Sequence, residues 1–324
     1  MGRVVMLFTG GTISSQFDPQ SGGHRAVLSA AEILRGTPGL DAVADVEAID
    51  WGRVPASQFT FTQLFDIVGV LRDALAQDEV DGAVLVQGTD SIEETSMALD
   101  VLLDSSKPVV VTGSMRSPDQ DGYEGAVNLR DAVACASAAD MREQGVVVTL
   151  AGEIHPADDV VKTNPQAYGT FRSPNAGPIG VINAGRVILM RKRARRRHVD
   201  ADSAAEPIHL FTSAIGVDGS LIRVAHQHGA RGFVIAGAGT GNGPVDMLDA
   251  CTAAIADGIP VVLATRCPSG RSEPAYSFPG AGATWRDAGA VLAGSVSALK
   301  SRILLALGVG AGLDAGGLSQ LFSD

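Results

Sequence analysis

Residues Val4–Thr12, VVMLFTGGT, join five consecutive apolar residues to a glycine pair and a threonine. An apolar run of this length that ends in glycines is typical of a buried strand feeding a tight turn. Glycines at such a turn let the backbone bend sharply and leave room for a ligand beside it. The same residues would also suit an ordinary strand and turn with a hydroxyl cap, so the function of Thr12 depends on its surroundings.

Three further apolar runs repeat this pattern along the chain, with helix-like segments between them: Gly82–Val86, Pro108–Thr112 and Val146–Leu150. Such an alternation predicts a mostly parallel sheet with right-handed crossovers. Ligands bind beyond the carboxyl ends of the strands in sheets of this kind. Three of the four strand ends carry glycine with threonine or serine, so we expect the site to lie there.

A second α/β block follows a break in composition after residue 190. Residues 191–198 read RKRARRRH, and a polar stretch follows to residue 206. Beyond it, Phe233–Ala236 and Pro260–Ala264 are expected as buried strands with a helix between them, and 297–307 and 315–322 as closing helices. We therefore predict two α/β domains with mostly parallel sheets, a larger N-terminal domain 1–190 and a smaller C-terminal domain 208–324, joined by a linker 191–207.

The charge balance is acidic, with 36 Asp and Glu against 25 Lys and Arg and a formal net charge of −11. An acidic surface repels nucleic acid and anionic membranes. The basic run 191–197 alone would suggest a nucleic-acid patch, but no aromatic residue interleaves to stack bases. We interpret it as a solvated linker and expect neither nucleic acid nor a membrane as partner.

The cysteines and histidines do not form a recognisable metal or disulfide pattern. Cys135, Cys251 and Cys267 are far apart without CxxC spacing, and the six histidines lack the spacing of metal ligands. We therefore expect no metal and no other cofactor. No segment has the roughly 18 continuous apolar residues of a membrane span, and the chain starts without a charged leader. The sequence predicts a cytoplasmic protein.

Residues 87–95, QGTDSIEET, place a second Gly-Thr pair after a strand and before a helix. Thr89 or Asp90 is expected near the helix N-terminus, where free N–H groups can hold a carboxylate or an oxyanion. A capped helix, with Asp90 or Ser91 as N-cap and Glu93 or Glu94 answering it, accounts for the polar residues. It does not account for a second Gly-Thr pair after a second strand.

Lys162 lies among apolar and polar residues in the segment 159–164, DVVKTN. A lysine in this setting is usually a surface residue with its amine in water. The catalytic interpretation requires Lys162 beside a hydroxyl and a carboxylate. It could then accept a proton from Thr89 while Asp90 holds it in place.

These segments, in this order and spacing, resemble the bacterial L-asparaginase family. They are Thr9–Ile13, Gly88–Thr95, Lys107–Arg116, Asp159–Asn164, Phe171–Pro178, Gly241–Gly243 and Arg266–Gly270. The resemblance covers nearly the whole chain, and the set is much more specific than any one motif. It implies hydrolysis of L-asparagine to L-aspartate and ammonia. It also implies a homodimer or homotetramer in which a neighbouring chain completes each site.

The resemblance assigns roles to individual residues. Thr12 matches the family's nucleophile, which attacks the amide carbon and forms an acyl-enzyme. Thr89, Asp90 and Lys162 match a hydrogen-bonded set that assists proton transfer, and Asp90 also matches the residue that binds the substrate's α-amino group. Ser57, with its neighbour Gln58, matches the segment that binds the α-carboxylate.

Ser114 matches the small residue that faces the scissile amide. The chain departs from the family at three places. Many relatives carry a tyrosine in the mobile loop after the first threonine, whereas this loop reads GGHRAV at 22–27 and the first tyrosine is Tyr123. Another group, a water or Tyr276 would have to serve in its place. Gln87 replaces a usual histidine, and Ser91 a usual threonine.

Other classes of protein fit less well. The glycine-rich run 237–243 follows a predicted strand, but its spacing is not that of a dinucleotide-binding turn, and no suitable acidic residue follows. Two alternatives remain. One is a related amidase, of glutaminase or transamidosome type, with the same threonine site. The other is a weakly catalytic amino-acid-binding protein, although keeping Thr12 together with a proton relay disfavours it.

Overall fold

The apolar run at the start of the chain forms strand β1 (Arg3–Phe8) in the computed structural model, which describes residues 2–323. It pairs in parallel with β4 (Asp45–Asp50) on one side and β5 (Val80–Val86) on the other. Strands β6 (Val109–Thr112) and β7 (Val146–Leu150) continue the parallel part of the sheet. The predicted mostly parallel sheet is confirmed.

The order of the parallel strands creates a topological switch point at the carboxyl ends of β1 and β5, which we call the crevice. Across the sheet they run β4-β1-β5-β6-β7, so the connections leave the carboxyl ends of β1 and β5 in opposite directions. Such a switch point is where open α/β sheets bind their ligands. The turn with Thr12 follows β1 and the turn with Thr89 follows β5. Both therefore lie at this crevice.

Three antiparallel strands extend the sheet beyond β7: β8 (Glu153–Pro156), β11 (Gly180–Asn183) and β12 (Arg186–Leu189). The sequence analysis did not identify these three strands. A separate two-stranded sheet pairs β9 (Val161–Lys162) with β10 (Phe171–Arg172).

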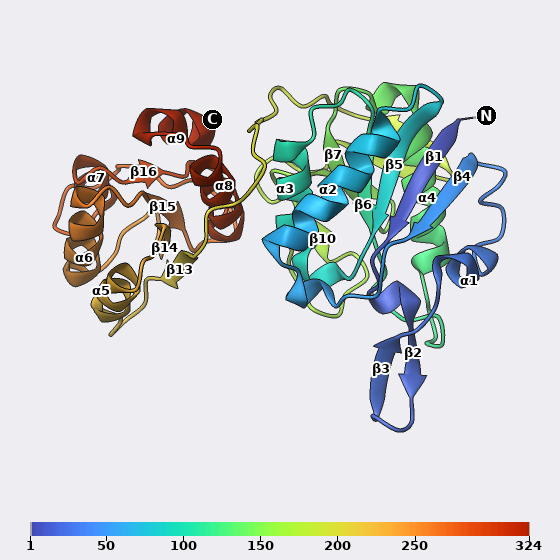
Figure 1. Cartoon of the computed structure of the whole chain (residues 1–324), viewed down its shortest axis with the longest axis horizontal. Coiled ribbons are helices and arrows are strands. Elements are labelled where there is room, and N and C mark those ends of the chain that lie inside the picture. The colour runs from blue at the N-terminus through green and yellow to red at the C-terminus, as the bar shows by residue number, and fades with distance from the viewer. Residues whose placement is uncertain (1, 324) are drawn as a thin grey trace. The chain divides into compact units, whose positions relative to one another are not determined.

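Helices cover both faces of the sheet (Figure 1). Val4, Met6 and Phe8 pack with α1 (Ala30–Arg35) and α4 (Gly125–Ser137). Val5 points to the other face, towards α2 (Phe61–Leu75), beside which α3 (Ile92–Leu102) lies. Burial on both faces explains why these strands are continuous apolar runs. Short 3-10 turns complete this unit: η1 (Thr12–Ser14), η2 (Ala56–Gln58), η3 (Thr89–Ser91) and η4 (Ala139–Met141).

The segment after Thr12 forms a β-hairpin of β2 (Ser15–Asp18) and β3 (Gly23–Ala26). Figure 1 shows this hairpin extending away from the body of its unit. The sequence analysis described the same residues as a loop.

The C-terminal unit has a wholly parallel sheet of four strands: β13 (Ile208–Thr212), β14 (Gly232–Gly237), β15 (Val261–Thr265) and β16 (Val291–Leu292). Its helices are α5 (Ser220–Gln227), α6 (Val245–Ala256), α7 (Gly282–Asp287), α8 (Ala298–Gly310) and α9 (Ala315–Phe322). Trp285 and Phe233 are fully buried in its core. The expected smaller parallel α/β domain is thus confirmed.

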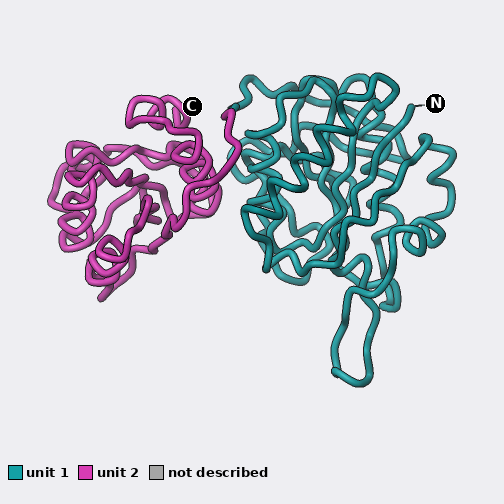
Figure 2. The backbone as a smooth tube through the Cα atoms, viewed as in Figure 1, with its two compact units in different colours: residues 1–198 teal, residues 199–324 magenta. Residues whose placement is uncertain are grey.

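The chain divides between His198 and Val199, within the segment that we expected as the linker (Figure 2). Part of that segment is buried in the first unit: the side chain of Arg193 is 4% exposed and that of Arg196 is 21% exposed. The interpretation of the arginine run as solvated is therefore wrong for these two residues. Among residues 2–323, no helix has both the length and the apolar character needed to cross a membrane.

Candidate active site

Three glycine turns meet at the carboxyl ends of β1, β5 and β6. A Cβ atom added to Gly11 would lie 2.3 Å from the Gly88 nitrogen, so the turns after β1 and β5 touch through their backbones. Gly11 has a φ of 94°, which L side chains rarely adopt. A Cβ added to Gly113 would lie 2.4 Å from the Gln87 carbonyl oxygen. Only glycines allow this approach, which brings Thr12 and Thr89 onto adjoining turns.

Thr12 opens η1 and is half-buried. The hydroxyls of Ser14 and Ser15 both donate to the Gly11 carbonyl, at 2.8 and 2.9 Å. These bonds fix the peptide before Thr12. Its own hydroxyl makes no hydrogen bond with another side chain among residues 2–323, and it is thus available to an incoming molecule.

Thr89, Asp90 and Lys162 form one contact cluster. The Lys162 Nζ donates to Thr89 Oγ1 at 2.9 Å and to Asp90 Oδ1 at 3.0 Å. Thr89 is 6% exposed, whereas the side chains of Lys162 and Asp90 are 15% and 65% exposed. The amine therefore lies between a buried hydroxyl and a carboxylate that faces solvent. An amine in this position can pass a proton to or from a hydroxyl.

The backbone of Lys162 is also tied to the helix that follows Thr89. Its N–H donates to Glu93 Oε1 at 2.8 Å, and Glu93 lies in the first turn of α3. Ser91 occupies the expected N-cap position of α3, but its side chain makes no capping hydrogen bond. Instead the Ser91 hydroxyl donates to the Ala56 carbonyl at 2.9 Å.

The expected substrate-binding residues lie around the same turns. Ser57 and Gln58 are exposed in η2, which the Ser91 bond joins to η3. Ser114 follows Gly113 and is buried, and its hydroxyl donates to the Arg116 carbonyl at 2.7 Å. A Cβ on Gly113 would lie 3.4 Å from Thr89 Cγ2, so Ser114 follows a residue in contact with Thr89.

Gln87 lies fully buried beneath the Thr89 turn. Its Nε2 donates to the Gly88 carbonyl at 3.2 Å. Its Oε1 has no hydrogen-bond partner within the described chain, residues 2–323. The side chain therefore supports the turn from inside through its bond to Gly88.

The tyrosines lie outside the hairpin. Tyr123 packs against the core of the first unit, and burial together with the Glu124 charge raises the pKa of its hydroxyl to about 12. It stays protonated at neutral pH and is no substitute for an activating base. Tyr276 is exposed in the second unit, beside Phe278.

Asp119 joins the hairpin to the body of the first unit, a role that the sequence analysis missed. Its Oδ2 accepts from the Phe17 amide at 2.8 Å, and its Oδ1 lies 3.4 Å from His24 Nε2. The Ser117 hydroxyl, at 2.6 Å, and the Phe17 amide hold the pKa of Asp119 below its usual value. Arg25 pairs instead with Asp18 of the same hairpin, at 3.5 Å.

No group of three or more His, Cys, Asp or Glu side chains among residues 2–323 is arranged to hold a metal ion. The buried thiols of Cys135 and Cys251 lie in helices α4 and α6, and burial raises the pKa of both. The polar side chains around the crevice are the hydroxyls of the threonines and serines, the Gln58 amide, the Lys162 amine and the Asp90 carboxylate.

Comparison with known proteins identifies the family of the chain. The family model for the asparaginase N-terminal domain matches residues 3–195, and that for the glutaminase/asparaginase C-terminal domain matches residues 208–322. A probable L-asparaginase of Deinococcus radiodurans is 33% identical, with 94% of this chain and 91% of that protein covered. An L-asparaginase of Bacillus licheniformis is 28% identical, with 94% of each chain covered.

The fold agrees as well. The crystal structure of a probable cytoplasmic L-asparaginase from Campylobacter jejuni superposes with a TM-score of 0.89 at 25% identity and covers 99% of each chain. The protein therefore belongs to the asparaginase family, and the resemblance drawn from its motifs is confirmed. It is an amidohydrolase of the L-asparaginase type.

Proposed function

We propose that the protein hydrolyses the side-chain amide of L-asparagine, with Thr12 as nucleophile and Thr89, Asp90 and Lys162 as proton relay. The observation that carries this proposal is the contact of Lys162 Nζ with both Thr89 Oγ1 and Asp90 Oδ1, at 2.9 and 3.0 Å. This cluster lies on the turn that touches the Thr12 turn.

The chemistry proceeds in two steps. The Thr12 hydroxyl gives its proton to the relay as its oxygen attacks the amide carbon, the C–N bond breaks, and the relay delivers that proton to the nitrogen, which leaves as ammonia. Water then attacks the resulting ester, which releases L-aspartate and returns the proton to Thr12. The relay serves both steps, because Lys162 can exchange protons with the Thr89 hydroxyl while Asp90 holds the amine in place.

Substrate recognition follows from the groups around the crevice. Asp90 has an exposed carboxylate, which can bind the α-ammonium group of the substrate through a charge-assisted hydrogen bond. Ser57 and Gln58 offer a hydroxyl and an amide to the α-carboxylate. We assign Ser114 to the side that faces the scissile amide, since its oxygen can still accept a hydrogen bond while its hydrogen is donated to Arg116.

Ammonia release from a panel of L-Asn, D-Asn, L-Gln and small ω-amides tests the proposal. We expect the highest kcat/KM with L-Asn. Ammonia release from none of these compounds, by a folded protein, would overturn it.

Glutamine hydrolysis is the second candidate, because a relative from Pseudomonas aeruginosa that is 28% identical is named a glutaminase-asparaginase. The same panel separates this candidate, and other related amidases, from an asparaginase. A weakly catalytic amino-acid-binding protein would bind L-Asp or L-Asn in calorimetry without releasing ammonia.

We further propose that the chain works as a homodimer or homotetramer in the cytoplasm, with the site near a subunit interface. The relative from Campylobacter jejuni is described as cytoplasmic, whereas one from Haemophilus influenzae is named periplasmic. Sedimentation velocity and the distribution of activity between cytoplasmic and periplasmic extracts test the two parts. A fully active monomer would exclude a site that needs a neighbouring chain.

A further inference from the structure

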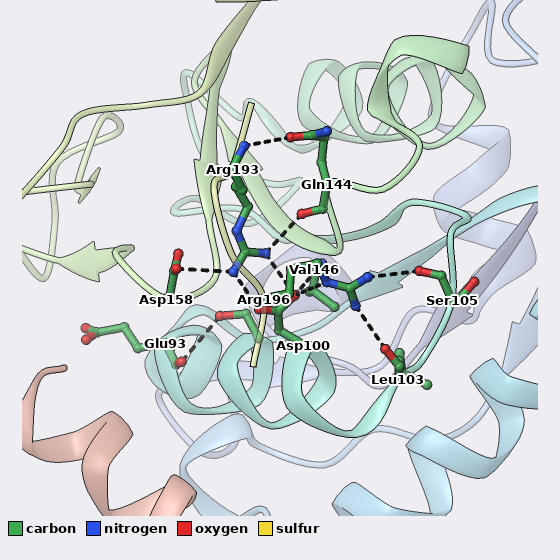
Figure 3. Close-up of polar contacts among 10 residues, drawn as sticks. Glu93, Asp100, Leu103, Ser105, Gln144, Val146, Asp158, Arg193 and Arg196 are labelled. Carbon is green, nitrogen blue, oxygen red and sulfur yellow. Dashed lines mark hydrogen bonds and ion pairs between the residues drawn. The ribbon is translucent and has the colours of Figure 1, made fainter. Parts of the chain in front are cut away.

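Two arginines of the run after β12 enter the first unit, and the proposed function gives neither a role. Figure 3 shows the guanidinium groups of Arg193 and Arg196 converging on the carboxylate of Asp100. Asp100 lies near the C-terminal end of α3, with 3% of its side chain exposed. Charges at this depth persist only when they are paired and hydrogen-bonded. The cluster therefore fixes the backbone segments that it joins.

Arg193 joins two segments of the chain to each other, and it is itself anchored on a third, where its Nη1 donates to the Gln144 carbonyl at 2.9 Å. Its Nη1 and Nη2 bind Asp100 Oδ1 and Oδ2 at 2.9 and 2.7 Å, as a two-pronged pair. Its Nη2 also lies 3.2 Å from Asp158 Oδ2. The planar guanidinium holds both carboxylates in a fixed relation, which a flexible lysine could not do.

These two segments are the ones that carry the proton relay. Asp100 belongs to α3, the helix that begins directly after the Thr89 turn, and Asp158 precedes Lys162 by four residues. The bond from the Lys162 amide to Glu93 joins the same two segments at a second point. Arg193 thus links the segment before Lys162 to α3 near the end of that helix opposite Glu93.

We propose that Arg193, through Asp100 and Asp158, is a positioning residue that holds Lys162 Nζ against Thr89 Oγ1. The inference rests on the proposed function of that pair. Arg193 itself does not contact the substrate in this proposal, because it acts by holding the segment before Lys162.

Arg196 provides an internal control from the same ion cluster. Its Nε lies 3.5 Å from Asp100 Oδ1, and it donates to the carbonyls of Leu103 and Ser105 at 2.9 and 3.1 Å. These contacts all lie in α3 or just beyond its end. Removing Arg196 weakens the cluster without cutting the link to the Lys162 segment.

The test compares Asp158→Asn with Arg196→Gln. Asp158 is 30% exposed, and asparagine keeps its shape while removing the charge. We expect Asp158→Asn to lower kcat for L-Asn by about ten- to a hundredfold with little change in KM, as small misplacements of catalytic groups do. Arg196→Gln should lower the Tm by at least as much and leave kcat near wild type. Asp158→Glu, which retains the carboxylate, should recover most of the activity.

A second measurement does not depend on turnover. The chain has only four lysines, Lys107, Lys162, Lys192 and Lys300, so ¹³C-methylated lysine signals are resolvable by NMR and a Lys162→Arg variant assigns one of them. The Lys162 signal should shift in Asp158→Asn and stay in place in Arg196→Gln.

In an active enzyme the inference requires both changes, and either one without the other overturns it. Equal losses of kcat in Asp158→Asn and Arg196→Gln overturn it as well, since they indicate general destabilisation. Absence of ammonia release by the wild-type protein would instead defeat the proposed function, while the Lys162 signal still decides whether Arg193 positions that residue.

Discussion

Thr12 and Thr89 follow neighbouring strands of one sheet, on turns whose backbones touch, but the chain around them is held differently. Beyond Thr12 lies an exposed hairpin, which Asp119 ties to the body of its unit. Beyond Thr89 lies α3, whose Asp100 is buried in a cluster with Arg193 and Arg196. The Thr12 side is therefore held to the body of the unit by a few contacts of an exposed hairpin, whereas the Thr89 side is held by a buried ion cluster.

We expect the two sides to serve different functions, with access at the Thr12 side and proton transfer at the Thr89 side. A hairpin with few ties to the body of its unit can move for each turnover, as active-site lids do. Proton transfer needs donor and acceptor within hydrogen-bond distance, which a fixed Lys162 and Thr89 maintain. Substitutions on the two sides can therefore show whether proton transfer and substrate access depend on different parts of the site.

The largest effect is expected at Thr12. Thr12→Ala should lower kcat by several orders of magnitude while the Tm stays near wild type, because only the nucleophile is removed from a half-buried position. Thr12→Ser should keep a measurable part of the activity. Ammonia release and thermal melting of the three proteins provide the measurement. Near-normal turnover by Thr12→Ala would remove this residue from its proposed role.

Lys162→Met should lower kcat by at least about a hundredfold, as is usual for the loss of a general acid or base. Methionine keeps most of the side-chain volume, so folding should be retained. Lys107→Met is the matched control, because Lys107 Nζ donates only to the backbone carbonyls of Leu75 and Gln77, at 2.9 and 2.6 Å. Equal kinetics for the two variants would make Lys162 an ordinary surface lysine.

A smaller effect, mainly on stability, is expected where the two turns touch. Gly11→Ala places a Cβ 2.3 Å from Gly88 at a φ of 94°, which should cost about 3 kcal/mol or more in the free energy of unfolding from backbone strain and overpacking together. It should also reduce kcat by moving Thr12 away from Thr89.

Gly22→Ala separates the cost of backbone strain from the cost of overpacking. Gly22 also has a positive φ, of 67°, but a Cβ there would meet nothing within 4 Å. Its cost should be about 1–2 kcal/mol from the backbone alone, with kcat unchanged. Urea titrations of both variants measure the difference. Equal costs would mean that the contact between the turns contributes nothing.

The parallel core could be predicted from the sequence because burial on both faces leaves a readable apolar run, as in β1 and β5. The antiparallel strands β8, β11 and β12 could not. They have four residues each, exposed positions interrupt the apolar pattern of β11 and β12, and the sequence of β8, EIHP, is half polar although its residues are mostly buried. The hairpin was missed for a similar reason, since its strands carry exposed polar residues such as Gln16 and Arg25.

The site was only partly predictable. The glycine turns indicated the edge of the sheet at which Thr12 and Thr89 lie, and the family resemblance supplied Lys162, but no local signal places its amine beside Thr89, 73 residues earlier. The burial of Arg193 was not predictable, because its partner Asp100 lies 93 residues away and a basic run is usually solvated. Contacts of this kind depend on tertiary structure, which sequence periodicity does not encode.

The smallest effect is expected in the hairpin. His24→Ala removes a contact with Asp119, so it should raise KM a few-fold at most, since ion pairs between exposed side chains contribute little. Arg25→Ala is the control, because Arg25 pairs within the hairpin and its loss should leave KM unchanged.

The pH dependence of kcat tests the same assignment. The pKa of Asp119 lies below the ordinary carboxylate value, so its carboxylate stays ionised and accepts from the Phe17 amide at and above that value. Protonation weakens this bond only in stronger acid. The kcat–pH profiles of wild type and both variants should therefore coincide from about pH 5 to 8. A hundredfold fall in kcat with a displaced profile, in either variant, would place the base in the hairpin and make the assignment of proton transfer to the Thr89–Lys162 side wrong.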